Sequence, residues 1–206
     1  QSKDLGHGML MAENGQQALE ILAANKGMVD VILMDRMMPV MDGIRAVRAI
    51  KDDPTMRKIP IVMVTGAAGT RDIQEGIDAV AAGGTVNVAA GTYNEGILLN
   101  KPNVTVKATD GAQTTFINTP AGTLTVGVQV LANMGTVTFD GFTVKNFTES
   151  GIIQGMAART GTTFHVLNNI VEPYADYLRN GIQVSGDGST VIGNTVNGKR
   201  LTADWA

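Results

Sequence analysis

The stretch from residue 172 to 180 gathers side chains that could bind or cleave a sugar. Tyrosine rings stack on sugar faces, and carboxylates and guanidinium groups bind hydroxyl or carboxylate groups. Hydrolysis of a glycosidic bond needs two carboxylates that flank it. The candidate catalytic residues are therefore Glu172, Asp176, Asp140 and His165, and the candidate substrate-binding residues are Tyr174, Tyr177 and Arg179. The alternative is an ordinary solvated loop, with His165 as an outward-facing structural residue.

These residues lie among short runs of β-forming residues that recur between residues 97 and 196, separated by Gly, Asn and Asp. Such a pattern indicates stacked strands rather than helices. Two rows of apolar residues align from one repeat to the next: Phe139, Val166 and Val191, and, five residues later, Val144, Val171 and Val196. In this alignment His165 falls in a row with Thr138 and Thr190, and Gly151-Ile152 matches Gly181-Ile182.

Stacked coils bury their apolar side chains only against neighbouring coils, in one continuous core. The residues expected to point inward are Val86, Val88, Val104, Val106, Phe139, Val144, Ile152, Val166, Val171, Ile182, Val191 and Val196. Asn169 and Asn194 occupy equivalent turn positions, which predicts a ladder of asparagine hydrogen bonds. The last coil ends without an obvious capping helix, so we expect a homo-oligomer that forms through this end.

The segment from residue 72 to 93 predicts a helix, a Gly83-Gly84 break and a short strand with Val86 and Val88 on one side. It resembles the N-terminal cap and first coil of right-handed parallel β-helix proteins of the pectin-lyase-like superfamily. The resemblance implies a mainly β fold over residues 72–206, a short right-handed parallel β-helix (solenoid) with an N-terminal helix cap.

Residues 1–71 have a different pattern, with helices expected over 16–23 and 43–51 and buried strands over 29–34 and 59–64. Alternating strands and helices indicate an α/β sheet. The run VILMDRMMPVMDG resembles the phosphoacceptor strand and loop of bacterial response-regulator receiver domains. That resemblance implies that Asp35 is the phosphoacceptor and that Thr65 senses the phosphoryl group.

The same resemblance also implies an acidic pair for Mg²⁺ and a strand with a lysine, and we find neither in residues 1–71. Phosphoryl transfer depends on cations that neutralise the developing charge. We therefore expect residues 1–71 to be an incomplete, truncated receiver-like segment whose phosphoacceptor remnant is Asp35 with Thr65. Residues 72–206 form the second predicted domain.

The composition of the chain argues against several classes of partner and cofactor. The net charge is −3, and no basic run is longer than the Lys199-Arg200 pair, which argues against nucleic acid. Cysteine is absent, and no spaced His/Asp cluster predicts a metal site or another cofactor, although loop carboxylates could bind Ca²⁺ weakly. No apolar run has membrane-spanning length. No signal peptide opens the sequence, and the receiver-like part suggests a cytoplasmic origin.

Three functions remain open. Known β-helix enzymes of the pectin-lyase-like superfamily mostly cleave polysaccharides, so the resemblance implies a carbohydrate-active protein that works by hydrolysis or elimination. The acidic pairs of such hydrolases and the Arg-rich motifs of such lyases are absent, so whether the chain is an enzyme stays open. The alternative is a non-catalytic, glycan-binding or self-assembling module with an inert receiver remnant. The third is a phosphoacceptor switch through Asp35.

Overall fold

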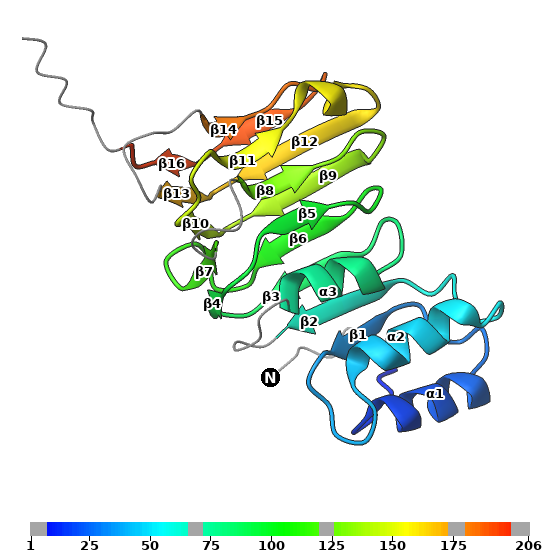
Figure 1. Ribbon diagram of the computed structural model, residues 1–206. Coiled ribbons are helices and arrows are strands. Elements are labelled where there is room, and N and C mark those ends of the chain that lie inside the picture. Colours follow the sequence, from blue (N-terminus) through cyan, green and yellow to red (C-terminus); the bar gives the residue numbers. More distant parts are fainter. Residues whose placement is uncertain (1–7, 66–71, 120–125, 173–179, 199–206) are drawn as a thin grey trace, which may run out of the picture.

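A computed structural model describes residues 8–65, 72–119, 126–172 and 180–198 (Figure 1). This part of the chain is mainly β, with three α-helices, a short 3-10 helix and parallel strand pairing throughout. The helices are α1 (Gly15–Ala24), α2 (Gly43–Asp52), α3 (Asp72–Ala79) and the 3-10 helix η1 (Met156–Arg159). Across the described ranges, none of the helices is long and apolar enough to cross a membrane.

Local sequence explains where the first two helices begin. The side chain of Asn14 accepts a hydrogen bond from the backbone N–H of Gln17, and that of Asp42 accepts one from the N–H of Arg45. Each satisfies a backbone donor that the helix itself cannot pair. The helices predicted over 16–23 and 43–51 are confirmed as α1 and α2, and the strands predicted over 29–34 and 59–64 as β1 and β2.

Three parallel sheets make up the rest. The seven-stranded sheet contains, in spatial order, β1 (Ile32–Asp35), β2 (Ile61–Thr65), β3 (Thr85–Val88), β6 (Thr105–Ala108), β9 (Gly135–Asp140), β12 (Thr162–Leu167) and β15 (Thr190–Ile192). The five-stranded sheet contains β4 (Gly91–Tyr93), β7 (Thr115–Asn118), β10 (Thr143–Lys145), β13 (Ile170–Glu172) and β16 (Thr195–Val196). The four-stranded sheet contains β5 (Ile97–Leu99), β8 (Val126–Val130), β11 (Ser150–Gln154) and β14 (Asn180–Gln183).

From β3 onward the chain visits the three sheets in turn, so that each sheet takes every third strand (Figure 1). We call residues 85–198 the three-sheet region. Strands β1 and β2 of the receiver-like segment join the same seven-stranded sheet, because β2 pairs with β3 along the whole length of β3. One sheet therefore runs across the predicted domain boundary at residue 71.

The predicted rows of the repeat are confirmed by strand register. Val166 pairs with both Phe139 and Val191, and Val171 pairs with both Val144 and Val196. Ile152 pairs with Ile182, and His165 pairs with Thr138 and Thr190. The asparagine ladder is confirmed as well, since Asn194 Oδ1 accepts hydrogen bonds from the backbone N–H and side-chain amide of Asn169.

Nine of the residues expected to point inward are buried, namely Val86, Val88, Val104, Val106, Phe139, Val144, Ile152, Val166 and Val171. The expectation is wrong for the last coil, where Val191 and Val196 are 50% and 47% exposed and Ile182 is partly buried. Burial in a stack requires a neighbour on each side. Among the described residues β14, β15 and β16 have a paired neighbour on one side only.

A column of glycines explains how closely the four-stranded sheet approaches the five-stranded sheet. Gly127, Gly151 and Gly181 lie opposite one another on β8, β11 and β14, as the flanking pairs of Ser150 and Ile152 require. A Cβ atom at Gly151 would lie 2.4 Å from Val171 Cγ1 and 2.6 Å from the backbone oxygen of Gly181. The glycines thus leave room for the valine row of the five-stranded sheet.

Helix α3 covers the first coil of the three-sheet region. The buried carboxylate of Glu95 accepts hydrogen bonds from the backbone N–H groups of Ile73 and Gln74, at 2.9 and 3.0 Å. The Gln74 side chain in turn donates to the backbone oxygen of Leu98 and accepts from its N–H. Gln74 therefore pairs with the outer edge of β5 as a neighbouring strand would.

Candidate functional site

Asp35 is the last residue of β1, at the carboxyl end of a strand that packs into the core through Met34. Its own side chain is exposed, and its Oδ1 accepts a hydrogen bond of 3.1 Å from the backbone N–H of Met37. The carboxylate is thus held at the surface by the first turn of the following loop. An exposed carboxylate at this position can reach a reactant in solution.

The start of α2 lies directly against the end of β1. The backbone N–H of Gly43 donates to the backbone oxygen of Arg36 at 3.0 Å. A Cβ atom at Gly43 would lie only 2.0 Å from the backbone oxygen of Asp35, so glycine is required for this approach. The N-terminal end of a helix carries partial positive charge and favours nearby anions. The start of α2 therefore lies next to the backbone of Asp35.

Arg36 connects this strand end to α3. Its Nη2 atom lies 2.8 Å from Oε2 of Glu75 in an ion pair that joins residues 39 positions apart. The Arg36 side chain is 19% exposed and that of Glu75 is 47% exposed. The pair links the candidate phosphoacceptor strand to the helix that caps the three-sheet region.

Thr65 ends β2, the strand beside β1. Val64 is the backbone partner of Asp35, so Thr65 follows one position further along. On the other side of β2, Thr65 pairs with Val88, which is fully buried. The strand beside Thr65 is thus β3, which contributes a valine there.

The residues around Asp35 that the structure describes do not fit a divalent cation. In the described ranges, no group of three or more His, Cys, Asp or Glu residues could hold a metal ion. Asp42, the nearest acidic residue of the motif, uses its side chain to cap α2. Among the described residues, this position therefore offers the Asp35 carboxylate and the helix terminus, without the acidic pair that the resemblance implies.

Asp140 and His165 lie on neighbouring strands of the seven-stranded sheet, and they are not hydrogen bonded to each other. The Asp140 carboxylate accepts a hydrogen bond of 2.9 Å from Asn168 Nδ2, and it lies 3.6 Å from Lys107 Nζ in an ion pair. His165 Nδ1 lies 2.8 Å from the Thr190 hydroxyl. The backbone partner of Asp140 on the strand of His165 is Leu167, two positions away from the histidine. Each of the two side chains is thus engaged with side chains other than its proposed catalytic partner.

Glu172 ends β13 in the five-stranded sheet and accepts a hydrogen bond of 3.2 Å from Asn197. It therefore lies on a different sheet from Asp140. The other predicted residues of this loop, Asp176, Tyr174, Tyr177 and Arg179, lie outside the described residues. Among the predicted catalytic residues that are described, none forms a pair of facing carboxylates.

Several contacts were missed by reasoning from the sequence. Arg36 and Glu75 gave no signal, because their pairing depends on how α3 packs against the end of β1. A second asparagine ladder, formed by Asn94, Asn118 and Asn146, could have been found from the spacing of these residues, which resembles the spacing of the apolar rows.

Comparison with known proteins supports the resemblance to receiver domains. Residues 3–85 match a family model described as "Response regulator receiver domain". The match extends past the predicted boundary at residue 71 and includes α3. No solved structure matches the chain. None of these comparisons supports the pectin-lyase-like resemblance.

Similar curated proteins include "Response regulator PleD" of Caulobacter vibrioides, 43% identical over 67 residues, which are 32% of this chain and 14% of that protein. "Autoinducer 1 sensor kinase/phosphatase LuxN" of Vibrio campbellii is 44% identical over 69 residues, 34% of this chain and 8% of that protein. "Probable transcriptional regulator ycf29" of Pyropia yezoensis is 32% identical over 75 residues, which are 36% of this chain and 33% of that protein. The chain thus spans a third or less of each of these relatives. What this establishes is a response regulator receiver domain match over residues 3–85, joined to a mainly β region of three parallel sheets.

Proposed function

We propose that Asp35 is a phosphoacceptor and that the N-terminal part of the chain receives a phosphoryl group. The observation that carries the proposal is the exposed Asp35 carboxylate at the carboxyl end of β1, beside the start of α2. The receiver domain match over residues 3–85 supports the same role. PleD and LuxN bear names that point to response regulation and to a sensor kinase/phosphatase, respectively.

In the proposed reaction, a carboxylate oxygen of Asp35 attacks the phosphorus atom of a donor such as acetyl phosphate. The new bond joins Oδ of Asp35 to phosphorus, and the bond from phosphorus to acetate breaks with its electrons on acetate. The added phosphoryl group carries about two negative charges, which the partial positive charge at the start of α2 stabilises. Because the described residues do not fit a divalent cation, the proposal concerns the acceptor group alone.

The test is phosphorylation by acetyl phosphate, in buffer with and without magnesium, followed by intact-mass spectrometry. We expect wild-type protein to gain one phosphoryl group and the Asp35→Asn variant to gain none. Asp30→Asn is the matched control, because Asp30 is an exposed carboxylate of the same segment outside the strand end. An unlabelled wild type, or labelling that survives Asp35→Asn, would refute the proposal.

We also propose that the three-sheet region is a right-handed parallel β-helix of the pectin-lyase-like kind. Its support is the topology in which each sheet takes every third strand, together with the cap made by α3. A polysaccharide-acting function would follow from that resemblance alone. Asp140 and Glu172 lie on different sheets and have separate hydrogen-bond partners. Their placement does not favour a pair of carboxylates that could hydrolyse a glycosidic bond.

The second candidate function is a self-assembling module, favoured by the exposed end of the stack. On β15 and β16 the apolar side chains of Val191, Ile192 and Val196 are 50%, 61% and 47% exposed. In the described residues each of these strands is paired along one edge only. Unpaired strand edges with apolar side chains favour pairing with another chain. A second copy joined through this end is therefore the proposed assembly.

A further inference from the structure

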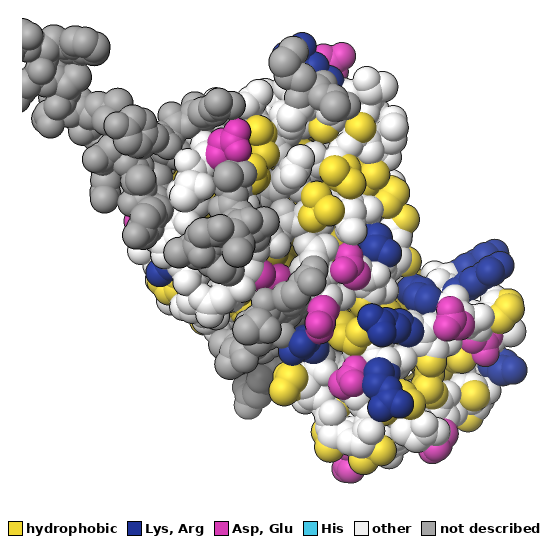
Figure 2. Space-filling model, viewed as in Figure 1, with side chains coloured by type: hydrophobic (Ala, Val, Ile, Leu, Met, Phe, Trp, Pro, Cys, Tyr) yellow, Lys and Arg dark blue, Asp and Glu magenta, His cyan; other side chains and the backbone are white. Residues whose placement is uncertain are grey.

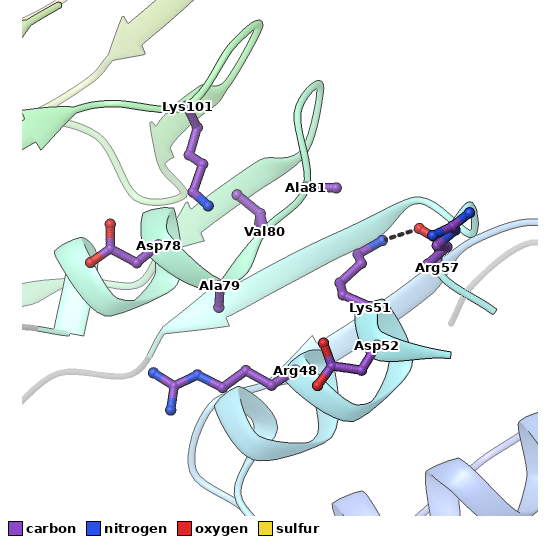
Figure 3. A pocket seen from close by; sticks show the side chains of 9 residues that line it. All are labelled: Arg48, Lys51, Asp52, Arg57, Asp78, Ala79, Val80, Ala81 and Lys101. Atoms are coloured by element: carbon purple, nitrogen blue, oxygen red, sulfur yellow. Dashed lines mark hydrogen bonds between the residues drawn. The ribbon is translucent and has the colours of Figure 1, made fainter. Parts of the chain in front are cut away.

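A groove of about 540 Å³ lies between α2 and the C-terminal end of α3 (Figure 3). Arg48, Lys51 and Asp52 line it from α2, and Lys101 reaches into it from the connection that follows β5. Val80, just after α3, is buried and forms part of its floor. The groove is thus built jointly by the receiver-like segment and the three-sheet region, and it lies apart from Asp35.

The lining carries more positive than negative charge. Four of its side chains are cationic, Arg48, Lys51, Arg57 and Lys101, and two are carboxylates, Asp52 and Asp78. The chain as a whole has a net charge of −3, so this local excess of positive charge runs against the overall balance. Figure 2 shows Lys and Arg side chains gathered on this part of the surface, with Asp and Glu between them.

Part of this charge is already engaged within the protein. The Lys51 ammonium donates to the backbone oxygens of Arg57 and Ile59, at 3.0 and 2.9 Å, and burial lowers its pKa from the ordinary value of 10.5. Asp78 accepts hydrogen bonds of 3.1 Å from the amides of Gln74 and Asn100. Lys51 and Asp78 are therefore explained by local structure.

The other three cations have no such explanation. Within the described ranges, Arg48, Arg57 and Lys101 take part in neither of the two ion pairs, which are Arg36–Glu75 and Lys107–Asp140. Like charges in one groove repel each other, and the carboxylates of Asp52 and Asp78 offset only part of the positive charge. One guanidinium group can donate two parallel hydrogen bonds to the oxygens of a phosphate group, and a lysine ammonium adds a point charge.

We propose that this groove binds a small oxyanion with several negative charges, of the diphosphate class, between Arg48 of α2 and Lys101 of the three-sheet region. Arg57 contributes from the far end of the groove. The ligand would bridge the two parts of the chain that meet at this groove. The proposal is independent of phosphorylation at Asp35, because none of the lining residues belongs to that strand end.

The test uses inorganic pyrophosphate as the probe, with isothermal titration calorimetry at low ionic strength and without metal ions. We expect saturable binding to the wild type that weakens as salt is added, because surface charges are screened over about 10 Å at 0.1 M salt. In the double variant Arg48→Gln/Lys101→Gln we expect the affinity to fall by about tenfold or more, as the loss of two exposed charge contacts implies. The control is Lys26→Gln/Arg45→Gln, which removes two exposed cations that do not line the groove.

A third variant changes the affinity in the opposite direction. Asp52→Asn removes a carboxylate from the lining, so pyrophosphate should bind more tightly to it than to the wild type. This variant does not depend on how well the double variant folds. The proposal is overturned if the wild type does not bind pyrophosphate, if both double variants lose the same affinity, or if Asp52→Asn leaves binding unchanged. Asp35→Asn should bind as the wild type does.

Discussion

Alanine in place of each glycine of the column in β8, β11 and β14 should destabilise the protein to different extents. At Gly151 a new Cβ would lie 2.4 Å from Val171 Cγ1, 2.6 Å from the backbone oxygen of Gly181 and 3.0 Å from Phe147 Cζ. Carbon atoms at ordinary contact are about 3.5–4.0 Å apart, so the two sheets would have to separate by about 1 Å. Val171 and Phe147 are fully buried and cannot turn away.

Overpacking a close-packed core costs about 1–3 kcal/mol, and we expect Gly151→Ala to lie at the upper end of that range. Gly127→Ala should cost somewhat less, about 2 kcal/mol, because its backbone obstacle, the oxygen of Gly151, lies at 2.8 Å. At Gly181 every close atom belongs to Val196, which is 47% exposed on the last strand. This side chain can move, so Gly181→Ala should cost about 1 kcal/mol or less.

The assay is urea unfolding followed by far-ultraviolet circular dichroism, with the midpoint and slope compared between variants. Gly155→Ala is the matched control, since nothing lies within 4 Å of its Cβ position and its φ of −62° suits alanine. It should be neutral or stabilise by about 0.4–1 kcal/mol, because alanine restricts the unfolded chain.

A double variant isolates the clash itself. Val144→Ala removes the side chain that obstructs alanine at position 127, so the pair Gly127→Ala/Val144→Ala should be less destabilised than the sum of the single variants. A cost for Gly181→Ala as large as that for Gly151→Ala, or additive effects of the changes at 127 and 144, would show that the glycine column does not relieve these contacts.

Two further predictions concern the end of the stack and the response to pH. Sedimentation velocity over a range of protein concentrations should show self-association of the wild type that Val191→Lys/Val196→Lys reduces, whereas a wild type that stays monomeric throughout would rule out assembly through this end. Hydrogen bonds from the Thr55 hydroxyl and backbone N–H lower the pKa of Asp53 below its ordinary value of 3.8, so its contribution to stability is present above pH 3.8 and is lost as the pH falls through the lowered value. Asp53→Asn should therefore be less stable than the wild type near neutral pH and approach it in acid, and a difference that does not depend on pH in urea unfolding would contradict this.

The receiver motif and the repeat could be predicted from the sequence because both depend on the order of residue types within short segments. Side chains alternate along a strand, so a stack of strands repeats the same residue types at the same row, as Phe139, Val166 and Val191 do. The position of Asp35 at a strand end follows in the same way from a buried apolar run that stops at a carboxylate.

Tertiary structure alone decided the features that depend on neighbours distant in sequence. Val191 has the same pattern as Val166 but is half-exposed, because among the described residues β15 is paired on one side only. Strand β2 pairs with β3, so that one sheet runs through both parts of the chain. This pairing could not be predicted, because the sequence assigned the two strands to two different folds, the receiver-like segment and the β-helix. The Arg36–Glu75 pair arises where α3 packs against the end of β1, and the basic groove arises where α2 and α3 come together. Side chains from separate elements acquire a common environment only through such packing.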